Sequence, residues 1–496
     1  MAERLRPPPA LGALLAVSLL LGVTWAAVLP AFQAPDEQSH FNYVQSLGAR
    51  HKLPGDPDRP FFSTQASKGI AAVNSDQVAG QLQVKPEWSD QLAARWAAAD
   101  KGYSRTDGGG RGPAYDYPPA AYMWEALGYA AASGGDLFDE LLGARLMSAL
   151  WVPVTVLAAW LLAGEILGRR RVLQTAVAAV PALSPMFVFI SSSVSPDGML
   201  YAVWTLALWT GVRAVKRRVP LVDAVVFFAL VGLACTVKAT SYALLVPAAF
   251  VGVYGLAARR PWRIGGVLKL GAAAAIPIAL TLGVWVLVAR SADHPAAAQV
   301  SAAAVAGTSS GGGTAAAAPT SGGTNWRELA SYLWQYYLPR LPFQKDFQMP
   351  FAGYPLLQVW ITQGWAAFGW LEVKFPPWVY RVLGVLTMAI FAGGLAALVR
   401  ARSRVDWRVA TFLALACLAL LAGLHWTDYH QVLAGSAGFM QGRYVFPVIG
   451  VIALALGGAI SLLPAARQRL ATGAAVAGLF VFHLFSLGLV LERFYA

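Results

Sequence analysis

Apolar residues gather along the chain in blocks of about 20 residues, and short polar or basic stretches separate these blocks. An α-helix of this length spans the ~30 Å hydrocarbon core of a bilayer. We therefore predict an all-α integral membrane protein with about eleven transmembrane helices. The predicted spans are 11–30, 142–167, 172–193, 198–214, 221–237, 240–257, 265–289, 377–399, 407–424, 444–463 and 471–490.

The stretch 221–257 is the least regular of these blocks, because Lys238 interrupts a long apolar run. It forms either two spans or one broken or re-entrant element, which is tolerated only where protein or water surrounds the break. A charge at this depth costs at least ~2.5 kcal/mol and usually marks a partner or a ligand. The alternative for Lys238 is a side chain that extends to the membrane interface.

Most lysines and arginines lie in short clusters between the apolar blocks, where the positive-inside rule assigns them to the cytoplasm. A cytoplasmic N-terminus and an outside C-terminus put all of these clusters on one side: 169–171, 213–218, 259–263, 400–408 and 467–469. Topology, and not nucleic-acid binding, therefore explains the net charge of +13.

Composition supports the membrane class, since hydrophobic residues make up 57% of 496 positions and charged residues 13%. A water-soluble chain of this length would need more polar surface. The two cysteines, Cys235 and Cys417, both lie in apolar blocks, so we expect buried free thiols. The first block lacks a clean small-residue cleavage site, which favours an uncleaved anchor over a signal peptide.

This topology predicts large polar segments on the outside. The first, 31–141, is rich in carboxylates and aromatic residues and is long enough for short juxtamembrane helices. The tract 291–324 consists mostly of Ala, Gly, Ser and Thr and is expected to be disordered, whereas 326–337 is predicted to form an aromatic interfacial helix. We therefore divide the chain into an N-terminal transmembrane module, 1–290, the insertion, and a C-terminal transmembrane module, 325–496.

The motif Pro-Asp-Glu-Gln-Ser-His at 35–40 directly follows the first span. Proline and acidic residues favour a helix N-terminus, so a helix is expected here with Asp36, Glu37 and His40 on one face. One interpretation is a capped helix start with a solvated acidic turn. The other is a carboxylate that acts as a general base at the membrane surface. A carboxylate–histidine metal site is a weaker alternative, because the motif offers few ligands.

Late in the same segment, Asp116 and Tyr117 precede paired prolines, and Tyr122 follows them. The tyrosine rings could stack on a sugar, and an interfacial aromatic belt is the alternative. Asp197 follows Ser-Pro at the end of the third span. It either caps the fourth span or lines a cavity as a carboxylate.

Arg443 lies in a Gln-Gly-Arg-Tyr segment, 441–444, at the predicted outer start of the tenth span. A guanidinium at this position suits bidentate binding of a phosphate oxyanion. The alternative is a cationic anchor at the membrane edge.

These features, taken in order, resemble the pattern of a bacterial membrane family of unknown function that is placed among the GT-C-type glycosyltransferases. The shared features are Pro-Asp-Glu-x-x-His at 35–40, Pro-Pro-x-x-Tyr at 118–122, Ser-Pro-Asp at 195–197, the membrane lysine Lys238, Phe-Gly-Trp followed by Pro and Tyr within 368–380, and Gln-Gly-Arg-Tyr at 441–444. Their order covers nearly the whole chain, whereas 291–324 looks like an insertion outside the pattern.

The resemblance implies a GT-C-like fold and an inverting glycosyltransferase in a bacterial plasma (inner) membrane, with its active site on the extracytoplasmic side. Such enzymes take sugars from polyprenyl phosphate. The expected partners are therefore that donor, membrane lipid, and an envelope glycan, lipid or protein acceptor, with no cofactor, no metal and no nucleic acid. Asp36 is the implied catalytic base, and Glu37 stays as the alternative.

In this scheme Asp36 accepts the proton of the acceptor hydroxyl as the hydroxyl attacks the anomeric carbon in one inverting displacement. Arg443 and Lys238 would bind the donor phosphate, because a donor aimed at the charge that develops on the leaving group is worth ~3 kcal/mol. The predicted substrate-binding residues are His40, Asp116, Tyr117, Tyr122, Asp197, Trp370, Gln441 and Tyr444.

A membrane transporter or lipid-linked sugar flippase without covalent chemistry is the main alternative, since it also explains many spans, Lys238 and a cavity-facing Asp197. It does not explain the carboxylate- and aromatic-rich first outer segment, and the chain shows no internal repeat of useful length. A scaffold in envelope assembly, and a polymerase or ligase acting on pyrophosphate-linked glycans, are further alternatives.

Overall fold

The computed structural model describes residues 8–86, 89–258, 264–291, 325–347, 354–435 and 439–496. Over these ranges the regular elements are helices, and an isolated bridge between Phe368 and Val373 forms no sheet. The all-α prediction is confirmed. Two predictions fall outside the described residues, namely the disordered tract from residue 292 onward and the basic cluster 259–263.

The N-terminal module begins with α1 (Pro9–Val28), which is followed by the short helices α2 (Glu37–Arg50), α3 (Thr64–Ala72), α4 (Ser75–Val78), α5 (Asp90–Asp100) and α6 (Ala120–Ala131). It continues with α7 (Leu137–Ala149), α8 (Trp151–Ile166), α9 (Arg171–Leu183), α10 (Pro185–Ser191), α11 (Asp197–Lys216), α12 (Leu221–Cys235), the 3-10 helix η2 (Ala239–Leu244), α13 (Leu245–Ala257), α14 (Ile264–Ile278), the π-helix η3 (Ala279–Gly283) and α15 (Val284–Ser291).

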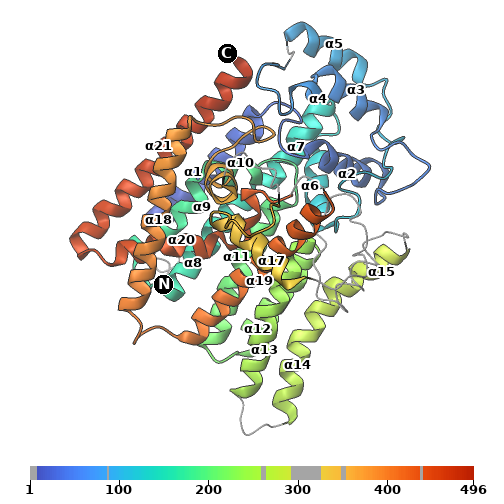
Figure 1. The fold of residues 1–496 in the computed structure, drawn as a ribbon. Helices are drawn as coiled ribbons and strands as arrows, with labels where there is room; N and C mark the ends of the chain where they lie inside the picture. The colour runs from blue at the N-terminus through green and yellow to red at the C-terminus, as the bar shows by residue number, and fades with distance from the viewer. Residues whose placement is uncertain (1–7, 87–88, 259–263, 292–324, 348–353, 436–438) are drawn as a thin grey trace.

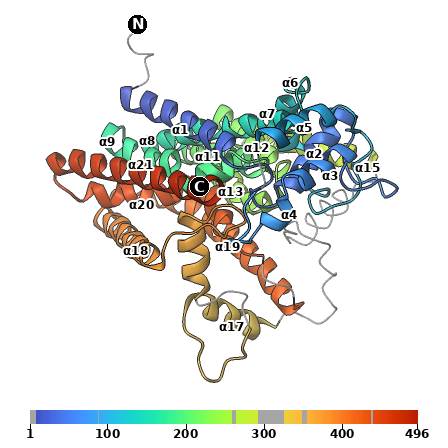
Figure 2. The same ribbon diagram turned by 90° about the horizontal axis from the view of Figure 1, so that it is seen from above.

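The described part of the C-terminal module comprises α17 (Trp326–Tyr337), the π-helix η4 (Leu356–Gln363), α18 (Pro377–Arg400), α19 (Trp407–Leu433), the 3-10 helix η5 (Gly442–Val448), α20 (Ile449–Ser461) and α21 (Ala465–Tyr495). The predicted aromatic helix at 326–337 is confirmed as α17. It lies at the edge of the molecule, beside the end of α19 (Figure 2).

By length and composition, eight described helical stretches can cross a membrane, or nine if the bent pair α9 and α10 is one span. Each predicted span falls on a helix, but α11 and α12 do not meet this criterion. The helix α12 is short, and α11 carries Asp197 in its first turn and Arg213 and Lys216 in its last. The count of eleven is therefore not confirmed, whereas the multi-pass membrane class is.

The stretch 221–257 is broken at Lys238, as one of the two interpretations anticipated. Lys238 has an extended backbone (φ −157°, ψ 141°) between α12 and η2. The carbonyl of Thr236, which the break frees from the helix, accepts the backbone N–H of Ala120 at the start of α6 (3.2 Å). Protein therefore surrounds the break and satisfies its backbone.

The short helices α2 to α6 cluster beside one end of the bundle, next to α7 (Figure 1). They share a small aromatic core with α7, in which Phe41, Tyr43 and Tyr122 are buried. The helices α6 and α7 cross closely at two glycines, since a Cβ on Gly128 would lie 2.1 Å from the carbonyl oxygen of Gly143. The predicted juxtamembrane helices are thus confirmed.

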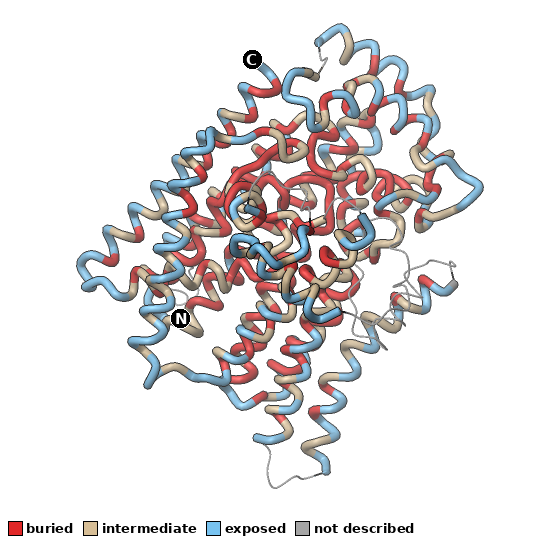
Figure 3. Tube along the Cα trace, in the orientation of Figure 1, coloured by how far each residue is buried: buried red, intermediate tan, exposed pale blue. Residues whose placement is uncertain are grey.

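Burial is concentrated in the middle of the bundle, whereas α18 and α21 present exposed faces (Figure 3). Large apolar side chains cover these outer faces, and Val382, Leu395 and Leu470 are all more than half exposed. Such helices would be costly in water but are suited to contact with lipid.

Candidate functional site

Asp36 is the residue from which α2 starts, in a left-handed backbone conformation (φ 63°, ψ 8°) that aspartate tolerates better than most residues. Its carbonyl accepts the first helical hydrogen bond, from His40 N–H (3.2 Å), but its side chain makes no capping bond. Instead, Oδ2 lies 3.1 Å from Nη2 of Arg443. The helix start has no side-chain cap and Glu37 is fully buried, so the interpretation as a capped helix start with a solvated acidic turn is wrong.

Arg443 reaches Asp36 from the other module because its backbone is held on two sides. Next to it, Gly442 lies against η4, where a Cβ would be 2.4 Å from the carbonyl oxygen of Val359. The Gly442 N–H also donates to Oε1 of Gln363 (3.1 Å), and the Tyr201 hydroxyl donates to the Arg443 carbonyl (3.1 Å). A side chain at position 442 would push Arg443 out of place.

Asp197 and Lys238 extend the contact between Asp36 and Arg443 into a line of alternating charges, here named the ionic chain. Nζ of Lys238 lies 2.8 Å from Oδ1 of Asp197, and Nε of Arg443 lies 3.8 Å from Oδ2 of Asp197. The Asp197, Lys238 and Arg443 side chains are nine-tenths or more buried, whereas that of Asp36 is 48% exposed. The charges sum to zero, which makes their burial tolerable.

Tyrosine rings cover the cationic end of the ionic chain. The Lys238 ammonium lies 5.2 Å from the ring centre of Tyr444 and 5.7 Å from that of Tyr117. The Arg443 guanidinium lies 5.5 Å from the Tyr444 ring. At these distances the rings stabilise the cations. The structure thus brings together residues predicted from motifs that are far apart in the sequence.

His40 lies one turn into α2 and is buried beside Tyr122. Its Nδ1 is 2.8 Å from the Tyr122 hydroxyl, and the Tyr122 ring stacks on Tyr43 (4.1 Å between centres). Burial, more than any neighbouring charge, lowers the pKa of His40 to about 4. The imidazole is therefore neutral at neutral pH and serves as a hydrogen-bonding group.

The other predicted site residues lie around this centre. Asp116 lies near Tyr43, whose pKa is raised by burial and then by the Asp116 charge. The Trp370 indole donates to the carbonyl of Phe32 (3.3 Å) and so supports the loop before Asp36. Gln441 directly precedes Gly442, and within the described ranges its buried Oε1 has no hydrogen-bond partner.

Glu37 is next to Asp36, but its carboxylate is fully buried and paired with Arg145. Arg145 Nε and Nη2 donate to it at 2.8 and 2.6 Å, and Val194 N–H donates to it at 3.1 Å. Arg145 also donates to three carbonyls where α1 ends, those of Ala26, Leu29 and Pro30. Both carboxylate oxygens of Glu37 therefore accept hydrogen bonds from the protein, and neither is exposed to a substrate. We correct its assignment from alternative base to structural residue.

Glu125 and Arg145 are buried groups that the sequence did not single out. Glu125 Oε1 accepts the Ser148 hydroxyl (2.5 Å) and the Ser195 N–H (3.0 Å). Burial raises the pKa of Glu125 well above its usual value. Glu37 and Glu125 thus hold two consecutive backbone amides just before Asp197. For Glu125, the available signal was a single charged residue in an apolar helical segment.

The site combines a half-exposed carboxylate with buried cations. Such a carboxylate can accept a proton, and the cations can bind an anionic group of a ligand beside it. Among the residues that the structure describes, no group of three or more His, Cys, Asp or Glu side chains could hold a metal ion. That the chain needs no metal and no cofactor stays a prediction.

Residues 19–452 match the family described as "Predicted membrane protein (DUF2142)". The chain belongs to the DUF2142 family. This confirms the resemblance to a membrane family of unknown function, and the matched range includes every residue of the ionic chain. No curated protein matches the sequence.

The fold of this DUF2142 member is similar to that of ArnT from Cupriavidus metallidurans in the apo state (TM-score 0.50, 14% identity, 97% of this chain and 76% of that chain). It is also similar to archaeal oligosaccharyltransferase AglB from Archaeoglobus fulgidus in complex with an inhibitory peptide and a dolichol-phosphate (TM-score 0.50, 12% identity, 98% of this chain).

ArnT bound to undecaprenyl phosphate gives a TM-score of 0.48 at 14% identity over 94% of this chain. The chain spans 63% of that ArnT chain and 56% of the AglB chain. ArnT and AglB are GT-C glycosyltransferases, so the predicted GT-C-like fold is confirmed.

We predict that Glu37→Ala lowers the free energy of unfolding by about 3 to 5 kcal/mol, because it leaves a buried guanidinium unpaired. The double variant Glu37→Leu with Arg145→Met should recover part of this loss, since it removes both charges. Denaturant unfolding in detergent micelles measures both. A double variant no more stable than the single one would contradict the unpaired guanidinium as the cause of the loss.

The neutral state of His40 predicts a dependence of stability on pH. The unfolded chain takes up a proton near pH 6.5 and the folded one only near pH 4, so stability is full above 6.5 and falls towards 4. His40→Gln should reduce this fall in thermal unfolding curves. His51→Asn is the matched control, because His51 is exposed and asparagine tolerates its left-handed backbone. An equal change in both variants would count against His40.

Proposed function

We propose that this DUF2142 protein is an inverting GT-C-type glycosyltransferase. It moves a sugar from a polyprenyl-phosphate donor to an envelope glycan, lipid or protein acceptor. The observation that carries the proposal is the 3.1 Å contact between the half-exposed carboxylate of Asp36 and the buried guanidinium of Arg443. On a GT-C-like fold, this contact puts a proton acceptor and an oxyanion binder within reach of one sugar phosphate.

Asp36 is the catalytic base in this proposal. A sugar or lipid hydroxyl has a pKa far above 7, so a carboxylate acts best by accepting its proton late, as the oxygen attacks the anomeric carbon. Asp36 has the most exposed side chain of the ionic chain, which leaves it open to an acceptor. A single displacement opposite the phosphate inverts the anomeric configuration.

Arg443 is the primary phosphate-binding residue, and Lys238 supports it. When the glycosidic bond breaks, the donor phosphodiester becomes a phosphomonoester and gains negative charge. Cations fixed where this charge develops lower the barrier without reorganising during the reaction. A phosphate oxygen that binds Nη2 of Arg443 would compete with Asp36 for that group, which leaves the Asp36 carboxylate to the acceptor hydroxyl.

Asp197 holds the two cations in place. It contacts Lys238 with one oxygen and faces Arg443 with the other, so both cations keep a counter-ion with no ligand bound. Tyr117 and Tyr444, which cover Lys238, are the rings closest to where the sugar would lie. His40, Tyr122, Trp370 and Gln441 then form a second layer around them.

The dolichol-phosphate bound to AglB supports a lipid phosphate as the donor's carrier in this chain as well. The positive-inside rule supports an extracytoplasmic position for Asp36 and Arg443, in a membrane that we propose to be the bacterial plasma membrane. A donor of this kind explains why such a site belongs in a membrane protein, because the polyprenyl chain stays in lipid while its phosphate is bound.

Asp36→Asn is expected to reduce sugar transfer by about a hundredfold to ten-thousandfold, which is the usual contribution of a general base. Asparagine keeps the size of the side chain and tolerates the left-handed backbone, and its amide oxygen can still accept from Arg443, which keeps Asp197 as a counter-ion. The fold should therefore be retained. The measurement is transfer of radiolabelled sugar from polyprenyl phosphate into membranes. Asp58→Asn, an exposed carboxylate of the same segment, is the control.

Transfer at the wild-type rate in Asp36→Asn would remove Asp36 from the role of base. The same membranes also separate this proposal from the flippase alternative. A transferase releases polyprenyl phosphate as the sugar moves, whereas a flippase moves the lipid-linked sugar with no covalent change.

Arg443→Lys is expected to weaken use of the donor, because lysine keeps the charge but not the planar fork that binds two oxyanion atoms. The rate at low donor concentration should fall by about a hundredfold, as for loss of one oxyanion donor. Transfer rates over a series of donor concentrations test this, and membrane insertion is checked in parallel. An unchanged donor dependence would contradict the phosphate contact.

A further inference from the structure

Asp428 is a buried carboxylate near the end of α19 that the proposed site does not use. It is 2% exposed, and none of the ion pairs among the described residues involves it. It lies about 20 residues, or ~30 Å, along α19 from the basic cluster 400–408, so it belongs to the same predicted side of the membrane as Arg443. A carboxylate buried in a membrane helix without a counter-ion is costly and usually has a function.

Two hydrogen-bond donors from different segments hold the Asp428 carboxylate. Its Oδ1 accepts the backbone N–H of Met440 (3.1 Å), and its Oδ2 accepts the hydroxyl of Tyr332 (2.5 Å). Met440 is 1% exposed and Tyr332 is 0% exposed, so both bonds are shielded from water. One side chain of α19 thus links α17 to the segment that leads into Arg443.

Met440 belongs to the short segment that carries Arg443 into the candidate site. The backbone of this segment, 440–443, is held by three side chains from three elements: Asp428 of α19, Gln363 of η4 and Tyr201 of α11. The contacts of Gln363 and Tyr201 lie in η5 itself, whereas Asp428 fixes how the chain approaches η5. A shift of the backbone at Met440 would therefore be passed to Arg443, whose side chain has to reach Asp36.

The helix α17 contacts Asp428 from the other side, and two of its tyrosines fasten it to α19. Tyr332 binds Asp428, and the hydroxyl of Tyr337 lies 2.7 Å from Nε2 of His425. The helix lies at the edge of the molecule (Figure 2), and Trp326 at its start is 69% exposed. The two hydroxyls differ in their partners, since that of Tyr332 reaches the carboxylate that binds Met440, whereas that of Tyr337 binds a histidine.

We propose that Asp428 is a positioning residue for the phosphate site at Arg443, and that Tyr332 of α17 orients its carboxylate. Asp428 does not touch the ligand. It acts through the Met440 N–H on the segment that carries the guanidinium, so the phosphate site is complete only when α17 is docked on α19. This inference rests on the proposed function, because a lipid phosphate at Arg443 is part of that function.

Binding of undecaprenyl phosphate to the purified full chain in detergent micelles tests the proposal, and it needs no sugar transfer. Asp428→Leu removes the acceptor and leaves the Met440 N–H buried and unpaired, so the dissociation constant should rise about tenfold. Asp428→Asn keeps an oxygen that accepts this N–H, and the Tyr332 hydroxyl can accept from the new NH₂ group. Its dissociation constant should therefore stay within about twofold of the wild-type value.

Two variants of α17 form a matched pair, since each removes one hydroxyl that binds α19. Tyr332→Phe should weaken binding about fivefold, the effect of one average hydrogen bond, whereas Tyr337→Phe should bind like the wild type. Hydrogen–deuterium exchange then shows whether the effect passes through Met440. Peptides that contain this amide should exchange faster in Asp428→Leu than in Asp428→Asn, because an amide exchanges faster once its hydrogen bond is lost.

Equal binding by Asp428→Leu and the wild type, or equal losses in Tyr332→Phe and Tyr337→Phe, would overturn the positioning role. Weaker binding by Asp428→Leu with unchanged exchange at Met440 would overturn it as well, since the effect would not pass through that amide. A wild type that does not bind undecaprenyl phosphate would instead remove the phosphate site at Arg443, on which the proposed function also depends. The two failures are therefore distinguishable.

Discussion

A buried arginine shared by two carboxylates holds the candidate site together. Arg443 contacts Asp36 and faces Asp197, and Asp197 in turn binds Lys238. A charge removed from water is costly unless an opposite charge accompanies it. Each of these four residues comes from a different segment, and each brings a charge that another neutralises. The segments therefore have to meet: the loop after α1, the start of α11, the break before η2 and the start of η5.

Asp36 and Glu37 are neighbours in the sequence, but their carboxylates contact different arginines, and the left-handed backbone of Asp36 lies between them. Asp36 faces Arg443 and stays half exposed, whereas Glu37 is fully buried against Arg145. Through Val194, the Glu37 carboxylate also holds the turn that leads to Asp197. Asp36 is thus itself one carboxylate of the ionic chain, and Glu37 helps to position the other, Asp197. Of the two adjacent acids, only Asp36 is exposed.

The lengths of the apolar blocks predicted much of the fold, because they follow from local composition. The charge of Lys238 in an apolar run offered the break as one of two interpretations, and the structure shows the break. The span count was not confirmed, since α12 is too short to meet the criterion and α11 carries charged residues in its first and last turns. The order of motifs, through the family resemblance, predicted that Asp36 and Arg443 meet. The roles of Glu37, Arg145 and Glu125 were not predictable, because each depends on a partner brought near only by the tertiary fold.

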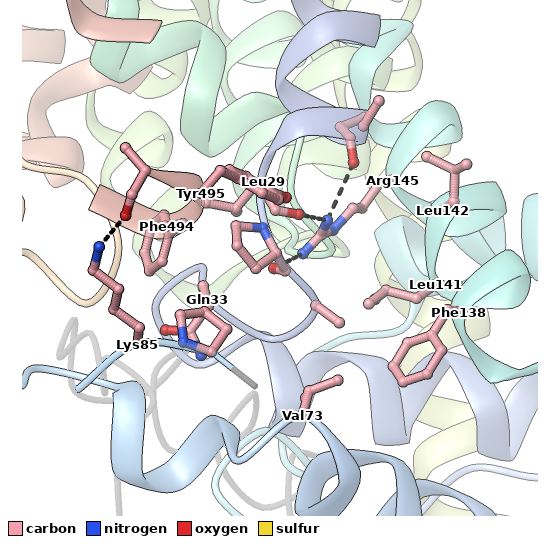
Figure 4. Close-up of a pocket in the computed structure, with 16 residues that line it drawn as sticks. Leu29, Gln33, Val73, Lys85, Phe138, Leu141, Leu142, Arg145, Phe494 and Tyr495 are labelled. Carbon is pink, nitrogen blue, oxygen red and sulfur yellow. Dashed lines mark hydrogen bonds between the residues drawn. The ribbon is translucent and has the colours of Figure 1, made fainter. Parts of the chain in front are cut away.

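The loop before Asp36 has contacts on two sides, and these contacts bear on how Asp36, the base that we propose, is held in position. Pro30 and Gln33 line a cavity of about 500 Å³ that also borders Arg145 (Figure 4), and the carbonyl of Phe32 accepts a hydrogen bond from Trp370. Arg145 donates to the carbonyls of Leu29 and Pro30, so the loop's backbone is tied to the same guanidinium that pairs with Glu37. A displacement of about 1 Å at a reacting group can cost ~100-fold in rate. Hydrogen bonds from the Arg145 guanidinium to the loop's backbone, in addition to apolar packing, therefore help to fix the position of Asp36.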